Sequence, residues 1–335
     1  MAMNAVSATN VADGSPTDTN SVGFDCSVET LPVPQGTDAS WVTAVSPDGR
    51  YVAGRTLFDD FYGGQEIRPI VWVDGEYYGF VDLPHQAPIM NGISSDGQAV
   101  VTVTVPLNDG EATVNSYSWA ENDVISLEDD LPSQGLGINE HHDMVGVIQS
   151  PGTENFHAVT FGEDGHERLD EPEDVHESLA NDIDDDGTIV GSVTNEDERV
   201  PYRWNAAGLG TELTLEDVNL QPATSVNDGW VVANGVHTDD GRVAAYWAPG
   251  QTEGTAIEFD QVSRINSEGW ITGVHNDAAA VIVDQEVISL PSPNDDPDLA
   301  DRAQDMSSDG SVIGGAVNRS QGGDDTREAA IWNCS

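Results

Sequence analysis

The stretch AVSPDGRYVAG, from Ala44 to Gly54, decides the fold because variants of it return at nearly regular intervals along the chain. Each copy has an apolar residue, a polar pair, a tight turn of the Asp-Gly type and a second apolar run, which predicts a β-hairpin. In the third copy His142 takes the place of the turn glycine. The other six copies are GISSDGQAVVT (92–102), GINEHHDMVGV (137–147), DIDDDGTIVGS (182–192), SVNDGWVVANG (225–235), RINSEGWITGV (264–274) and DMSSDGSVIGG (305–315).

A third apolar run follows each copy after a loop of variable length, and a fourth short run closes six of the seven units. Four short strands in a unit of about 45 residues are typical of a β-propeller blade. The sequence therefore predicts an all-β, seven-bladed propeller with four antiparallel strands per blade. An aromatic residue ends the third run in six units, and we expect it to pack between blades. The residues at this position are Trp72, Trp119, Phe161, Trp204, Trp247, Val283 and Trp332.

The seventh unit ends at AAIWNCS (329–335) without a fourth run, whereas CSVETLP (26–32) has the form of a closing strand that no unit precedes. We expect this N-terminal strand to complete the last blade and close the ring. Aligned on the intact second blade, Cys26 and Cys334 then fall at adjacent positions and are predicted to form a disulfide bond. A structural disulfide is typical of an oxidising, extracytoplasmic compartment.

The predicted domain division is a polar, disordered tail over residues 1–24 and a propeller over residues 25–335. The first residues have neither the basic start nor the apolar core of a signal peptide. No apolar run approaches the roughly 18 residues that a membrane helix needs, so no membrane insertion is expected.

The chain has 60 acidic residues, eleven arginines and no lysine, which gives a net charge of −49. Such a chain repels nucleic acid and anionic membranes at low salt, so nucleic acid is not an expected partner. An acid excess without lysine favours adaptation to molar salt, where charges are screened within about 3 Å. The alternative is an acidic secreted protein from a source that is not halophilic.

The segments GINEHHDMVG and FHAVTF (156–161) form a repeat that resembles the HAF repeat of extracellular proteins from bacteria and archaea. The stretch from Leu31 to Arg55 also resembles actinobacterial secreted propellers. The resemblance covers about Cys26 to Cys334, with departures at His142 and Val283. It implies an extracellular propeller and no common catalytic motif.

The loops between the second and third strands and the loops between blades vary in sequence, and a propeller brings both sets to one face. We expect that face to carry any recognition. Arginines recur just before the third strand and form the candidate binding face, although each could instead pair with a local carboxylate. These arginines are Arg68, Arg199, Arg242 and Arg327.

The segment DIDDDG resembles the start of a calcium loop, which makes Asp182, Asp184 and Asp186 a candidate calcium site. Its twelfth position is Val193, not an acidic residue, and Asp184 to Gly187 is also simply the turn of this repeat. No other cofactor and no catalytic residues are predicted.

We therefore interpret the chain as an extracellular or cell-surface binding or scaffold protein that recognises a glycan or a protein through its variable loop face. Its oligomeric state is not predicted. Two alternatives remain: a propeller enzyme, a lyase or glycosidase with a site at the channel mouth, and a structural subunit of a virion or cell-surface appendage.

Overall fold

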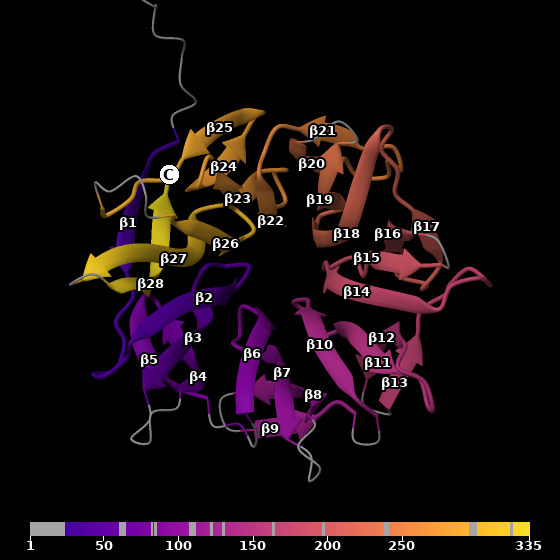
Figure 1. Cartoon of the computed structure of the whole chain (residues 1–335), viewed down its shortest axis with the longest axis horizontal. Coiled ribbons are helices and arrows are strands. Elements are labelled where there is room, and N and C mark those ends of the chain that lie inside the picture. Colours follow the sequence, from indigo (N-terminus) through magenta and orange to yellow (C-terminus); the bar gives the residue numbers. More distant parts are fainter. Residues whose placement is uncertain are drawn as a thin grey trace, which may run out of the picture.

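In the computed structural model, the described residues form 28 β-strands and no helix, arranged as seven four-stranded antiparallel sheets around a central axis (Figure 1). The predicted seven-bladed propeller is therefore confirmed. No helix in the described part of the chain is long and apolar enough to cross a membrane. The structure describes residues 24–59, 65–81, 83, 86–106, 112–120, 123–128, 131–162, 165–195, 198–237, 241–294, 300–321 and 324–335.

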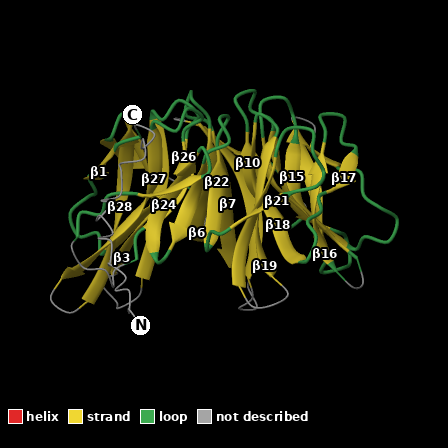
Figure 2. Cartoon of the chain, turned by 90° about the horizontal axis from the view of Figure 1, so that it is seen from above, coloured by secondary structure: helices red, strands yellow, loops and turns green. Residues whose placement is uncertain are grey.

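The strands of blades 1 to 6 follow one another from the axis outward in chain order, whereas blade 7 takes its outermost strand from the start of the chain. Figure 2 shows the ring edge-on. The innermost strands of blades 1 to 7 are β2 (Ala39–Val45), β6 (Gln86–Ile93), β10 (Ser133–Ile138), β14 (Glu177–Ile183), β18 (Val218–Asn227), β22 (Gln261–Ile265) and β26 (Arg302–Met306). The second strands are β3 (Tyr51–Asp59), β7 (Ala99–Pro106), β11 (Met144–Gln149), β15 (Ile189–Thr194), β19 (Trp230–His237), β23 (Ile271–His275) and β27 (Val312–Gln321).

The two outer positions complete each sheet. The third strands are β4 (Gln65–Val73), β8 (Ala112–Ala120), β12 (Phe156–Gly162), β16 (Arg199–Trp204), β20 (Gly241–Trp247), β24 (Ala278–Val283) and β28 (Asp324–Cys334). The outermost strands of blades 1 to 6 are β5 (Glu76–Phe80), β9 (Asp123–Ser126), β13 (Gly165–Arg168), β17 (Gly210–Glu212), β21 (Thr255–Ile257) and β25 (Glu286–Ser289), and that of blade 7 is β1 (Cys26–Thr30).

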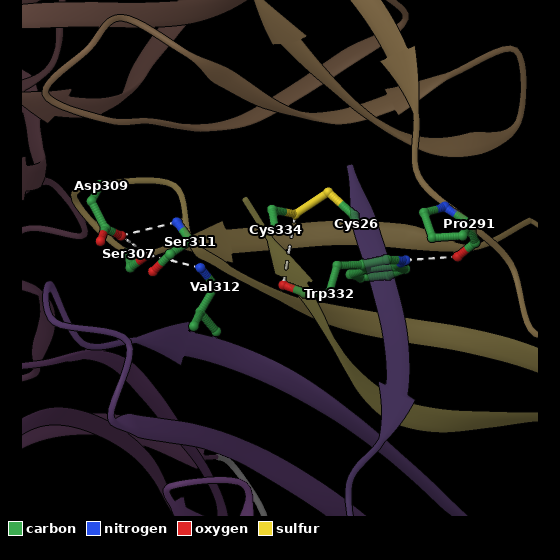
Figure 3. The surroundings of a disulfide bond; sticks show 8 residues. All are labelled: Cys26, Pro291, Ser307, Asp309, Ser311, Val312, Trp332 and Cys334. Carbon is green, nitrogen blue, oxygen red and sulfur yellow. Dashed lines mark hydrogen bonds between the residues drawn. A yellow bond between two sulfur atoms is a disulfide. The ribbon is translucent and has the colours of Figure 1, made fainter. Parts of the chain in front are cut away.

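The seventh blade is built from both ends of the described chain, as the sequence predicted. Strand β1 pairs antiparallel with β28 and places Cys26 opposite Cys334, where the two form a disulfide bond across a sequence separation of 308 residues (Figure 3). Backbone hydrogen bonds between Asp25 and Ser335 continue the ladder beyond the cysteines. Residues 1–23 of the predicted tail lie outside the described residues, and Phe24 packs its ring edge-on against Trp270 with centroids 5.3 Å apart.

The recurring aromatic residues are buried, and four of them form hydrogen bonds to the preceding blade. All seven side chains at this register are buried, and Trp72, Trp204, Trp247 and Trp332 have no exposed surface. These four indoles also donate from Nε1 to a backbone carbonyl just beyond the outermost strand of the preceding blade, as Trp332 does to Pro291 at 2.8 Å (Figure 3). The other acceptors are Pro32 for Trp72 at 2.7 Å, Asp170 for Trp204 at 2.7 Å and Thr214 for Trp247 at 3.2 Å.

The repeat turns adopt the left-handed backbone that the sequence predicted. The turn glycines have positive φ, between 71° and 90°, which glycine tolerates because it has no Cβ. His142 takes the same conformation with φ 66°, so a β-carbon is held where the other repeats have none. The turns also contact one another along the ring. Their blade-to-blade hydrogen bonds include Ser308 N to Pro47 O, Asp48 N to Ser95 Oγ, Ser95 N to Glu140 Oε1 and Glu140 N to Asp185 Oδ1.

Candidate functional site

A β-bulge interrupts every innermost strand at the same register. In blade 1, for example, the pairing of β2 with β3 skips from Val42 to Ala44 and leaves Thr43 without a ladder partner. A bulge re-aims the side chain of the extra residue, and all seven bulged residues line one cavity in the central channel. They are Thr43, Asn91, Leu136, Asn181, Thr224, Ser263 and Gln304.

The cavity has a volume of about 710 Å³, which is within the range of sites for small ligands. Gln261 and Arg302, the first residues of β22 and β26, line it. An innermost strand begins on the face that carries the inter-blade loops, so the cavity is the mouth of the channel on the variable loop face. We call it the channel cup.

An ion triad that joins three blades lies one residue further along the innermost strands than the bulged residues, and we call it the floor of the channel cup. The guanidinium of Arg264 in blade 6 lies with Nη1 2.9 Å from Asp182 Oδ2 in blade 4 and with Nε 2.9 Å from Asp305 Oδ1 in blade 7. The carboxylates are almost fully buried, at 1% and 6% exposed, whereas the Arg264 side chain is 26% exposed toward the channel. Arg264 and Asp305 both line the cup.

Both carboxylates of the triad also accept hydrogen bonds from backbone amides of the next blade. Asp182 Oδ2 accepts from Val226 N at 2.9 Å, and Asp305 Oδ2 accepts from Val45 N at 2.8 Å. Burial raises the pKa of both carboxyls above the ordinary aspartate value, and Arg264 opposes that rise. For Arg264 itself burial lowers the pKa, but the two carboxylates outweigh burial and the net direction is upward. The triad therefore ties blades 4 to 7 and blade 1 together through charged groups held in the channel.

The rim of the cup carries three arginines that form no ion pair within the described part of the chain: Arg55, Arg302 and Arg327. Arg55 stacks over the ring of Trp41 at 4.8 Å from its centroid. Its Nε is buried and has no acceptor among the described residues, and burial lowers its pKa. Arg302 and Arg327 are exposed, and Arg302 donates to Gln261 Oε1 at 3.5 Å.

The four arginines predicted as the binding face do not share one site. Only Arg327 lines the channel cup. Arg68 lines a separate cavity of about 360 Å³, contacts the rings of Phe58 and Phe80 and pairs with Glu66 at 2.8 Å.

The remaining two predicted arginines lie apart from Arg68 and from the cup. Arg199 lines a third cavity and pairs with Glu177 at 3.6 Å. Arg242 is exposed on β20. The alternative of local carboxylate partners is thus confirmed for Arg68 and Arg199.

The predicted calcium ligands point to different partners. Asp182 belongs to the ion triad, whereas Asp184 accepts from Thr188 N at 2.9 Å and from Gly229 N of blade 5 at 3.0 Å. Burial, with the adjoining carboxyl of Asp186, raises the pKa of Asp184 to about 7. The described residues contain no group of three or more His, Cys, Asp or Glu side chains that could hold a metal ion. Calcium binding stays a prediction without a preformed site in this part of the chain.

The sequence interpretation missed Arg55, Arg264 and Arg302. A signal existed, because aligning the seven repeats places each bulged residue immediately before the aligned copy. The alignment puts Asp182, Arg264 and Asp305 at one equivalent position, immediately after the bulge. In the other four repeats this position holds a small residue. The three charged residues at this position therefore indicate the channel.

No family model matches the chain, and no curated protein matches it. Among solved structures, the chain is similar to an uncomplexed acylaminoacyl peptidase of Pyrococcus horikoshii, with TM-score 0.60 and 12% identity over 89% of this chain and 52% of that one. The β-propeller domain of the Trilobed protease from Pyrococcus furiosus, described as having an open velcro topology, has TM-score 0.57 and 12% identity over 88% of this chain and 95% of that domain.

A Mycobacterium tuberculosis puromycin-hydrolyzing peptidase has TM-score 0.55 and 9% identity over 86% of this chain and 51% of that one. The chain thus spans about half the length of each of the two peptidases. At identities this low, these likenesses show a propeller scaffold.

Proposed function

We propose that this chain is an extracytoplasmic binding protein that takes the end of a glycan chain into the channel cup. The observation that carries the proposal is the cavity itself, which has a volume of about 710 Å³ and lies on the variable loop face, with the Arg264 guanidinium joining blades 6, 4 and 7 beside it. Because this guanidinium bridges three blades within the channel, the cavity suits the end of a chain or a small ligand rather than a strand that passes through the ring.

The polar lining supports a hydroxyl-rich ligand. Six of the seven bulged residues are Thr, Asn, Ser or Gln, which offer both donors and acceptors at the depth that a ligand would reach. Four of the six donate hydrogen bonds to backbone carbonyls, whereas Ser263 and Gln304 form no side-chain hydrogen bond within the described residues. A polar ring of this kind favours a sugar over an apolar ligand.

The extracytoplasmic location in the proposal is supported by the disulfide between Cys26 and Cys334, because such bonds persist in oxidising compartments. The acidic composition and the HAF-like repeats support an extracellular protein that works in concentrated salt.

The raised pKa of Asp305 at the floor is the observation that favours the rival enzyme. Its oxygens are nevertheless engaged: Oδ1 by Arg264 Nε and Met306 N, and Oδ2 by Val45 N. A guanidinium and two amides hold this carboxylate in place, so its oxygens are turned toward groups of the protein rather than toward a substrate. This arrangement supports binding over acid–base catalysis.

A glycan array probed at 2 M KCl tests the proposal. Ser263→Trp fills the cup from its wall and leaves every arginine of the lining unsubstituted, and Val236→Trp places the same side chain at an exposed position of β19 outside the cup. We expect selective glycan binding that Ser263→Trp abolishes and Val236→Trp retains, with both variants as thermally stable as the parent. Equal binding by both variants would place recognition elsewhere, and release of shortened glycan from the parent protein would favour the enzyme.

A further inference from the structure

Cationic side chains are concentrated in the channel cup to a degree that the composition does not explain. The chain has eleven arginines, no lysine and 60 acidic residues, yet four arginines line this one cavity. They are Arg55, Arg264, Arg302 and Arg327. Asp305 is the one acidic residue among the described lining residues. A solvated acidic surface would place carboxylates here, whereas the lining of the cup carries the opposite charge.

The floor of the cup contributes little free positive charge, since Arg264 is neutralised by Asp182 and Asp305. The charge available to a ligand belongs to the rim. Arg55, Arg302 and Arg327 come from blades 1 and 7, so they gather on one side of the mouth. A ligand entering the cup therefore meets a cationic wall on that side and a polar wall on the other.

Arg55 is held ready for a ligand. The Trp41 ring fixes the plane of its guanidinium, while its buried Nε lacks an acceptor in the described part of the chain. Leaving a charged donor buried and unsatisfied is costly, and burial already lowers the pKa of this guanidinium. An oxyanion accepting from Nε and a terminal nitrogen would satisfy the fork in the two-bond geometry that guanidinium groups favour.

We propose that the channel cup selects sugars that carry an oxyanion, a carboxylate or a sulfate, which the guanidinium groups of Arg55, Arg302 and Arg327 bind directly. This inference rests on the proposed function and names the ligand class of the same site. In molar salt, charges are screened within about 3 Å, so discrimination depends on direct hydrogen-bonded contacts rather than on long-range attraction. Arginine makes such contacts in pairs, whereas a lysine ammonium acts as a point charge.

The test compares three oligosaccharides that differ only in the terminal sugar: neutral glucose, glucuronate and a sulfated glucose. Binding is measured by calorimetry at 0.2 and 2 M KCl. We expect the parent protein to bind at least one acidic form at least tenfold more tightly than the neutral form at both salt concentrations. Preference for glucuronate or for the sulfated sugar identifies which oxyanion the rim accepts.

The double variant Arg302→Gln/Arg327→Gln removes two exposed rim charges, and Arg199→Gln/Arg242→Gln removes two exposed charges outside the cup. The first is expected to lose at least tenfold in affinity for the acidic sugar and to keep its affinity for the neutral one. The second is expected to change neither. Arg55→Gln should act like the rim variant, but the exposed pair tests the idea even if Arg55→Gln does not fold.

The outcomes separate the two proposals. Equal affinity for acidic and neutral sugars, lost in Ser263→Trp, would overturn the oxyanion inference and leave the glycan-binding function standing. Binding of free glucuronate that Arg302→Gln/Arg327→Gln abolishes, without binding of any oligosaccharide, would overturn the glycan function and support the oxyanion site. Equal losses of affinity for the acidic sugar in Arg302→Gln/Arg327→Gln and in Arg199→Gln/Arg242→Gln would overturn the inference, because they would reflect total charge alone.

Discussion

Replacing Arg264 by methionine tests whether the ion triad holds the ring together. The substitution keeps an unbranched apolar stem but leaves Asp182 and Asp305 without their cation, each having lain 2.9 Å from a guanidinium nitrogen. The two carboxylates are 1% and 6% exposed, so solvent cannot replace the lost partner. Breaking a buried ion pair by removing one member costs about 3–5 kcal/mol of unfolding free energy.

The loss should depend on pH with a definite sign. Burial raises the pKa of Asp182 and Asp305, and removing Arg264 removes the charge that opposes this rise. The folded variant then holds protons that the unfolded chain has released, so stability is lost as pH rises toward the folded pKa values. Each unit of added shift corresponds to about 1.4 kcal/mol. We therefore expect Arg264→Met to be most destabilised at pH 8 and less so at pH 5, relative to the parent protein.

The assay is urea unfolding at 2 M KCl, followed by tryptophan fluorescence at pH 5, 6.5 and 8, because urea leaves the ionic strength unchanged. The triple variant Asp182→Asn/Arg264→Met/Asp305→Asn removes all three charges and should recover part of the loss at pH 8. A loss below about 1 kcal/mol at pH 8, or a loss that is the same at all three pH values, would refute the account of the triad.

Three further predictions follow from the ring closure and the repeat turns. The double variant Cys26→Ala/Cys334→Ala should keep the β-sheet circular dichroism spectrum but lose roughly 5 kcal/mol of unfolding free energy, measured with urea. The reason is that the disulfide bond closes a loop of 308 residues in the unfolded chain, and a loss below about 1 kcal/mol would contradict it. His142→Gly should raise the unfolding free energy by about 1 kcal/mol, because φ is 66° at this position and the histidine's ion pair is exposed; unchanged or lower stability in 2 M KCl would count against it. Burial beside a second carboxyl raises the pKa of Asp184 to about 7. The unfolding free energy of the parent protein, relative to that of Asp184→Asn, should therefore fall by about 2 kcal/mol from pH 5 to pH 8. A constant difference between the two proteins would show that this carboxyl stays ionised.

The fold could be predicted from the sequence because its determinants are local and repeated seven times. An Asp-Gly turn specifies a hairpin within a few residues, and in six of the seven units a buried aromatic residue ends the strand that follows the hairpin. Cys26 and Cys334 could be paired because the last blade lacked a fourth strand and the N-terminal strand lacked a blade. Even the departure at His142 was interpretable, since the histidine keeps the glycine conformation.

The channel cup could not be predicted in the same way because its partners lie far apart in the sequence. Sixty acidic residues conceal the two, Asp182 and Asp305, that face Arg264 across the channel. The predicted arginines lie within the first four residues of third strands, which two other strands separate from the axis. Arg327 still reaches the cup, where the intervening strand β27 contributes only Gly315, which has no side chain, and the small Ala316 to the lining.

The closure of blade 7 also determines how the molecule would respond to mechanical force. The Cα atoms of Cys26 and Cys334 lie 4.1 Å apart although 308 positions separate them in the sequence. Tension applied to the chain at Asp25 and Ser335 would therefore pass through one covalent bond and leave the six other blades unloaded. A propeller connected in this way can be pulled at both ends without unwinding.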